Sequence, residues 1–224
     1  KWNESANWTG GVAPASVTEV EFNVPDAIPC TVASAALADY VLMGNSGPGG
    51  TLIITNGGSL TCGAVNASVI GNDSNAVMVV ANGGSASFNY QLMIGLNYGA
   101  DGTLIITNGC TVSVAGMFYL GYFGGTGTAL IHGGILNLSQ WDDGYAISGD
   151  SVLDVAGTGE VVITGDHQSV VETFVSLGMI TADGGAGTVM VDYNNINAGK
   201  TTIYAAGLVL PPAQEFWNPA LNPV

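Results

Sequence analysis

The chain has 224 residues, of which 47% are hydrophobic, 8% are charged and 34 are glycine. Seventeen acidic residues stand against two lysines, and the net charge of −15 argues against a nucleic-acid partner, because neutralising phosphates requires a basic patch. No run of about 18 apolar residues is present, so we expect no membrane insertion. This composition favours a domain of many short strands and tight glycine turns.

The first element expected along the chain is a short N-terminal cap, residues 1–15. A first strand is expected at Val20-Glu-Phe22, and a divergent first coil ends at Leu42-Met-Gly44. A last strand is expected at Lys200-Thr-Thr-Ile-Tyr-Ala-Ala, and residues 208–224 are expected to be a proline-rich tail or linker.

Between these ends, residues 51–148 contain a repeat of about 26 residues. Asn56, Asn82 and Asn108 are each 26 residues apart, and each follows a strand-like segment and precedes a turn; His132 is aligned with these asparagines in a fourth copy. An antiparallel sandwich would not keep such a register. The repeat predicts a right-handed parallel β-helix of about six or seven coils over residues 16–207.

Stacking of the coils predicts internal columns of apolar side chains. One column is Leu60, Ala86, Val112 and Leu136, and a second is Ile70, Ile94, Leu120 and Ile147. Cys62 joins a third with Phe88, Val114 and Leu138, so we expect it to be buried. We expect Cys30 and Cys110 at equivalent turn positions about three coils apart, roughly 14 Å, which is too far for a disulfide.

The opening Trp2-Asn-Glu-Ser-Ala-Asn-Trp8-Thr-Gly-Gly-Val-Ala-Pro14 resembles the start of β-helical modules in large secreted bacterial proteins with autotransporter-associated strand repeats. The resemblance covers roughly residues 1–205 and extends to β-helical carbohydrate-binding modules. It implies a secreted or cell-surface location within a larger multidomain protein. It does not fix a function, because such folds host lyases, hydrolases, adhesins and glycan-binding modules alike.

Catalytic signals are weak. Asp142-Asp143 is the only adjacent acid pair, and neighbouring residues on a strand point to opposite faces, so the two would converge only in a loop. We favour a solvated polar turn for this pair. His132 is expected to bond its stacked neighbours, and His167 lies in a turn without metal-ligand spacing. No catalytic residue and no cofactor is predicted.

Calcium is the one metal that the sequence leaves open. Four acids fall in glycine-rich turns where a cation would relieve their crowding: Asp73, Asp101, Asp150 and Asp183. The nonapeptide array typical of calcium-binding β-helices is absent, so we favour ordinary solubilising turns.

Aromatic residues gather on one side of three consecutive coils. Counting from the closing Leu120 places Tyr119 on the surface, whereas Phe118 and Tyr145 are expected inside, beside Leu92. The predicted binding residues are Tyr98, Tyr119, Tyr122, Phe123, Trp141, Asp142 and Asp143. Sugar rings stack on such aromatic faces while carboxylates bind their hydroxyls.

The leading hypothesis is a non-catalytic carbohydrate-binding module of a secreted polysaccharide-degrading protein, with a polysaccharide as partner. The first alternative is a structural or adhesive β-helix segment of a bacterial surface protein. The second is a polysaccharide lyase or glycoside hydrolase.

Overall fold

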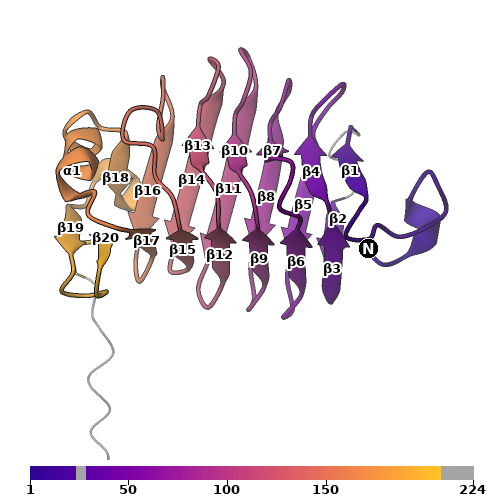
Figure 1. Cartoon of the computed structure of the whole chain (residues 1–224), viewed down its shortest axis with the longest axis horizontal. Helices are drawn as coiled ribbons and strands as arrows, with labels where there is room; N and C mark the ends of the chain where they lie inside the picture. The colour runs from indigo at the N-terminus through magenta and orange to yellow at the C-terminus, as the bar shows by residue number, and fades with distance from the viewer. Residues whose placement is uncertain (24–28, 208–224) are drawn as a thin grey trace, which may run out of the picture.

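The computed structural model describes residues 1–23 and 29–207, and it shows a parallel β-solenoid of about six turns. The coils lie side by side along one axis, from the indigo N-terminal end to the orange C-terminal end (Figure 1). Within these residues, helix is confined to three short elements: η1 (Ser5–Asn7), α1 (Gln168–Ser176) and η2 (Asp183–Gly185). The predicted all-β parallel fold is confirmed. The proline-rich tail lies outside the described residues.

Three sheets run along the solenoid, and each regular coil contributes one strand to each sheet. Sheet A contains β1 (Glu19–Phe22), β4 (Tyr40–Met43), β7 (Ser68–Ile70), β10 (Leu92–Ile94) and β13 (Phe118–Leu120). Sheet B contains β2 (Cys30–Val32), β5 (Thr51–Ile54), β8 (Ala76–Val80), β11 (Asp101–Thr107), β14 (Thr126–His132), β16 (Val152–Ala156) and β18 (Ile180–Ala182). Sheet C contains β3 (Ala35–Ala38), β6 (Ser59–Cys62), β9 (Ser85–Phe88), β12 (Thr111–Val114), β15 (Ile135–Leu138), β17 (Glu160–Thr164), β20 (Lys200–Ala205) and β19 (Val189–Tyr193).

Neighbouring strands pair in parallel one coil apart, and the register stacks like side chains in columns. In sheet C, Leu60 pairs with Ala86, Ala86 with Val112 and Val112 with Leu136. All four are buried. The column of Ile70, Ile94, Leu120 and Ile147 is formed in the same way. Both predicted columns are confirmed, because the alternation of apolar and polar residues turns one side of each strand inward.

The turns between sheets B and C that follow β5, β8 and β11 contain the recurring asparagine. Asn56 and Asn82 adopt left-handed backbone angles (φ 54° and 50°), and the Asn82 side-chain amide donates to Thr55 Oγ1 of the previous coil at 3.1 Å. The alignment of His132 with these asparagines is wrong, because His132 pairs with Thr107. Only two residues separate it from Ile135, whereas three separate Thr107 from Thr111, so this turn is one residue shorter.

Each strand of sheet A from β4 to β13 is followed by a glycine that meets the next coil. Gly95 after β10 has φ 66°, and a Cβ there would overlap the carbonyl of Thr126. Only glycine satisfies both the left-handed backbone and this close approach.

The three cysteines are free thiols. Cys62 is buried in the column of Phe88, as predicted, and burial raises its pKa to about 12. The turn position expected for Cys30 is wrong: it lies within β2, paired with Leu52 of the inward column. The divergent first coil lacks the Asn-Gly pair that marks turns in later coils. Cys30 therefore could not be aligned with those coils from the sequence alone.

The C-terminal end, residues 139–207, departs from the repeat. A loop, residues 139–151, replaces the next strand of sheet A and keeps one parallel bridge, Leu120 to Ile147. Strand β20 pairs antiparallel with both β17 and β19, so the predicted last strand exists but runs against the stack. Helix α1, which the repeat does not predict, contacts β18 and β19 and buries Val171 and Phe174 (Figure 1).

Candidate functional site

The predicted binding residues come from two turns, strand β13 and the 139–151 loop. Tyr98 and the pair Tyr122 and Phe123 lie in the turns that follow β10 and β13. These turns are neighbours, because Asn97 bridges to Gly124 across them. The structure thus brings aromatic residues of successive coils together beside the loop that carries the acids.

The turn after β13 carries two aromatic residues, Tyr122 and Phe123, and the neighbouring turn carries Tyr98. The rings of Tyr119 and Tyr122 stack with centroids 4.6 Å apart, and those of Tyr122 and Phe123 lie 4.3 Å apart at 46°. Tyr98 is 91% exposed and Phe123 is 71% exposed. Burial of large apolar side chains is favourable, so exposed fractions as high as those of Tyr98 and Phe123 are unusual.

Tyr119 lies beneath this group. The outward direction expected for it implies a surface position, but it is only 8% exposed, because the Tyr122 ring covers one side and its hydroxyl donates to Asp142 Oδ2 at 3.4 Å. Burial raises the pKa of this hydroxyl, and the Asp142 carboxylate raises it further. Tyr119 therefore supports Tyr122 and joins the aromatic turn to the acidic loop.

Trp141 is part of the core. It is 6% exposed, and its ring meets Phe174 of α1 edge-on with centroids 6.0 Å apart. A ring in this position cannot stack on a ligand at the surface. The indole instead fixes the 139–151 loop and α1 to the solenoid.

Asp142 shapes the loop. Its Oδ1 accepts hydrogen bonds from the backbone N–H groups of Gly144 and Tyr145 at 3.0 and 3.1 Å, which is the geometry of an Asx turn. Within this turn the Tyr145 side chain is 63% exposed, so its predicted inward position is wrong. Phe118 is buried in register with Leu92, as predicted. The loop thereby adds a further exposed ring to the site.

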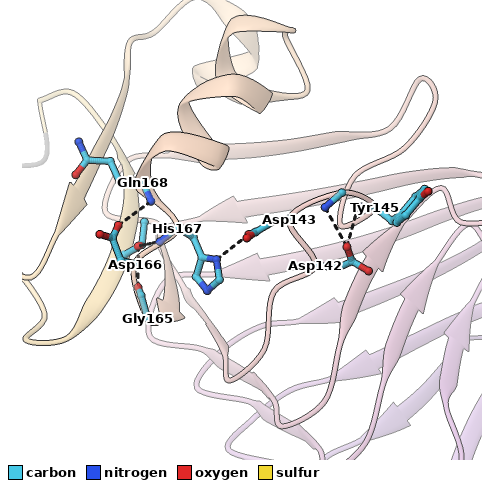
Figure 2. A network of polar contacts seen from close by, with 9 residues as sticks. Asp142, Asp143, Tyr145, Gly165, Asp166, His167 and Gln168 are labelled. Atoms are coloured by element: carbon cyan, nitrogen blue, oxygen red, sulfur yellow. Dashed lines mark hydrogen bonds and ion pairs between the residues drawn. The ribbon is translucent and has the colours of Figure 1, made fainter.

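Asp143 makes a contact that the sequence did not predict. Its Oδ1 lies 2.8 Å from Nδ1 of His167, and the His167 backbone N–H donates to Thr201 Oγ1 at 2.9 Å. Figure 2 shows Asp143 turned toward the His167 ring while Asp142 faces the backbone at Tyr145. The two neighbouring acids thus serve different partners and do not converge on one point.

The other histidine also pairs with an aspartate. His132 Nε2 lies 3.0 Å from Oδ2 of Asp154, whose Oδ1 accepts from Thr181 Oγ1 at 2.7 Å and from the Gly184 backbone N–H at 3.0 Å. Asp154 is 3% exposed and borders a hollow of about 390 Å³. Each His–Asp pair is separated by 22 or 24 residues, close to one coil, and that spacing is the signal that could have identified both.

Metal ligation finds no support in these groups. Within residues 1–23 and 29–207, no group of three or more His, Cys, Asp or Glu side chains could hold a metal ion. Asp73, one of the turn acids, instead accepts hydrogen bonds from the side-chain amides of Asn72 and Asn97 at 2.9 and 2.8 Å. Neutral amide donors thus reach this carboxylate.

Comparison with protein-family models, with curated proteins and with solved structures finds no match to this chain. No helix in the described residues is long and apolar enough to cross a membrane. The fold therefore defines the class of protein, a parallel β-solenoid. The proposed function is based on the aromatic residues at its surface.

Proposed function

We propose that this protein binds a neutral polysaccharide without cleaving it, through an aromatic surface formed by Tyr98, Tyr122, Phe123 and Tyr145. The observation that carries the proposal is the exposure of three of these rings, 91%, 71% and 63% for Tyr98, Phe123 and Tyr145, beside the acidic loop. Flat aromatic faces stack on the C–H faces of sugar rings. A secreted or surface location within a larger protein accompanies this proposal.

Polar groups at the edge of the aromatic surface would bind sugar hydroxyls. Asp142 Oδ2 is 3.4 Å from the Tyr119 hydroxyl, a long contact that leaves the oxygen able to accept another donor. Asp143 remains 57% exposed in its side chain although it contacts His167. Tyr119 acts from below as a support, and Trp141 is left out of the surface because it lies in the core.

The charge of the chain favours an uncharged glycan. Lys1 pairs with Glu4 at the N-terminal end, and Lys200 lies on β20, so neither contacts the four aromatic rings in the described structure. A uronate or sulfated polymer would meet a protein of net charge −15 and be repelled. We therefore expect binding to change little with ionic strength.

Isothermal titration against soluble xylans, glucans and mannans, with and without calcium, tests the proposal. Tyr98→Ala and Phe123→Ala should each weaken binding by about 1–2 kcal/mol, or roughly 5- to 30-fold, because stacking area is lost. Leu177→Ala is the matched control, since Leu177 is 64% exposed but belongs to the end of α1. Its affinity should equal that of the parent.

Three outcomes would count against the proposal. Unchanged affinity in both aromatic variants would place the binding surface elsewhere. Release of shortened or unsaturated sugars on long incubation would favour the hydrolase or lyase alternative. Absence of binding to every glycan would favour a structural or adhesive segment.

A further inference from the structure

The turns that follow β4, β7, β10 and β13 are stacked along the solenoid, and we call them the sheet A ridge. The Asp73 backbone N–H donates to the Gly44 carbonyl at 2.8 Å, and the Asn97 backbone N–H donates to the Asn72 carbonyl at 3.0 Å. Asn97 also bridges to Gly124 in the following turn. Each turn therefore lies about one coil, or about 4.8 Å, from the next.

The N-terminal half of the sheet A ridge is a ladder of amide and carboxylate groups. The Asn72 side-chain amide donates to Asn45 Oδ1 at 2.8 Å and to Asp73 Oδ2 at 2.9 Å. The Asn97 side-chain amide donates to Asp73 Oδ1 at 2.8 Å. Asp73 is nevertheless exposed. Each of its oxygens therefore has a lone pair left for another donor, such as a sugar hydroxyl.

The C-terminal half of the sheet A ridge is aromatic. Tyr98 directly follows Asn97 of the ladder, and Phe123 lies in the next turn. The Tyr98 ring reaches that turn, because a Cβ placed on Gly124 would lie 3.4 Å from Tyr98 Cδ2. Hydrogen-bonding groups and exposed rings thus follow one another along one line.

The backbone at Phe123 indicates that its ring is not required by the turn. Phe123 has φ 57° and Gly124 has φ 87°. A bulky side chain is strained at a left-handed position, whereas glycine and asparagine adopt it readily, as Asn56 does here. Strained backbone is concentrated at active sites and ligand-binding sites. Strain and exposure together favour contact between this ring and a ligand.

We propose that the polysaccharide is an extended β-1,4-linked chain that lies along the solenoid axis on the sheet A ridge, with about one sugar per coil. This path depends on the proposed function being correct, and it adds the linkage, the direction and the polar contacts. Successive sugars of an extended β-1,4-linked chain advance by nearly the spacing of the coils. An α-1,4-linked glucan curves and would leave a straight ridge.

The two halves of the ridge contribute differently to binding. Tyr98 and Phe123 stack on two neighbouring sugars. Asp73 accepts hydrogen bonds from the sugar one coil nearer the N-terminus, and the amides of Asn72 and Asn97 hold its carboxylate in place before the ligand arrives. The first and last of the four turns are about 14 Å apart, so about four sugars contact the ridge.

Affinity as a function of chain length and linkage tests this path on the full chain. Isothermal titration compares cellohexaose, xylohexaose and mannohexaose, and NMR titration measures the disaccharide of the series that binds most tightly. The hexasaccharide should bind about tenfold or more tightly than the disaccharide, because it contacts the whole ridge. Maltohexaose, which is α-1,4-linked, should bind about tenfold or more weakly than the β-1,4-linked hexasaccharide.

Asp73→Ala separates the polar half of the ridge from the aromatic half. It should weaken hexasaccharide binding by about three- to tenfold and leave disaccharide binding unchanged, and the unchanged binding also shows that the variant is folded. Asp39→Ala is the matched control. Asp39 also accepts a side-chain amide from the following coil, that of Asn66 at 3.1 Å, but it lies before β4, at the opposite end of the sheet A strands. This variant should bind both ligands as the parent does.

The outcomes separate this path from the proposed function. Equal affinities for the disaccharide and the hexasaccharide, or for the α-linked and β-linked hexasaccharides, would overturn the path. The proposed function would still stand if Tyr98→Ala weakened binding in that case. Parental affinity of Asp73→Ala for the hexasaccharide would also overturn the path. Absence of binding to every saccharide would remove both the path and the proposed function.

Discussion

The regular stack, residues 51–138, and the C-terminal end, residues 139–207, use the same sheets but are held together differently. In the regular stack, parallel pairing repeats in register, so each column side chain meets its counterpart in the next coil. At the C-terminal end, β16 and β17 still pair in parallel with β14 and β15, but sheet A has no further strand, β20 is antiparallel, and contacts that occur once hold the 139–151 loop and α1. Trp141 on Phe174 and Asp143 on His167 are such contacts.

This difference has an energetic meaning. In the regular stack the cost of a substitution should depend on volume lost from a shared column and be similar from coil to coil. In the 139–151 loop and α1 the cost should depend on one particular partner, because no neighbouring coil repeats the contact. Four measurements test this contrast, in descending order of expected effect.

Trp141→Ala should have the largest effect, a loss of about 3–5 kcal/mol in the free energy of unfolding, because a buried indole leaves a large cavity. Urea denaturation measures it. Hydrogen exchange should show faster exchange in α1 and the 139–151 loop while β5 to β12 stay protected. Loss of glycan affinity without loss of stability would contradict the core position of this ring.

Leu136→Ala in the regular stack should cost about 2–4 kcal/mol, since Leu136 fills the column below Val112. Asp101→Ala is the control in the same part of the molecule, and its exposed side chain should contribute no more than about 0.5 kcal/mol. Equal effects of the two substitutions in thermal or urea unfolding would contradict the column model.

Asp154→Ala should cost about 1–3 kcal/mol, because the Thr181 hydroxyl and the Gly184 N–H lose a buried acceptor. Ser113→Ala offers a contrast, since it removes a half-buried hydroxyl from the regular stack and should have little effect. If Asp154→Ala is as stable as the parent, the polar contacts at the C-terminal end do not secure it.

Cys62 gives the smallest effect and a pH signature. Its thiol has a pKa of about 12 in the fold against 9.0 ordinarily, so it stays protonated when the unfolded chain ionises. The stability contributed by the protonated thiol is fully present below pH 9 and falls as the unfolded chain ionises, by about 1.4 kcal/mol in all between pH 8 and 10.

Urea unfolding of the parent and of Cys62→Val at pH 8, 9 and 10 measures this change. Valine suits the column, because Val114 occupies the equivalent position two coils further on. The matched variant is needed because a hydrogen bond to Glu19 also raises the pKa of Tyr40 to about 12. Identical pH profiles of parent and variant, or rapid alkylation of Cys62 at pH 8, would contradict its burial.

The regular stack could be predicted from the sequence, because the same pattern of turn and apolar residues recurs in successive coils. Leu60, Ala86, Val112 and Leu136 could be aligned since each follows an Asn-Gly or Gly-Gly turn, and their burial is confirmed. The same method misaligned His132, because one missing turn residue shifts the alignment by one position without changing the pairing of the strands.

The candidate site was harder to predict, because it depends on contacts that occur once. Alternation along a strand places Tyr119 outward, but it cannot show that Tyr122 folds over it. The same counting puts Tyr145 inside, whereas the Asx turn of Asp142 carries it into solvent. Trp141 is buried because α1 brings Phe174 to it, and no repeat predicts that helix.

The reversal of chain direction at β20 has a consequence for assembly. A stack of parallel strands ends in open edges that could accept another coil, and such edges template fibre growth. Here the last parallel strand of sheet C, β17, is paired with antiparallel β20, and β19 beyond it contacts α1. Sheet B ends in the three-residue β18. Head-to-tail polymerisation of the solenoid is thereby disfavoured at this end.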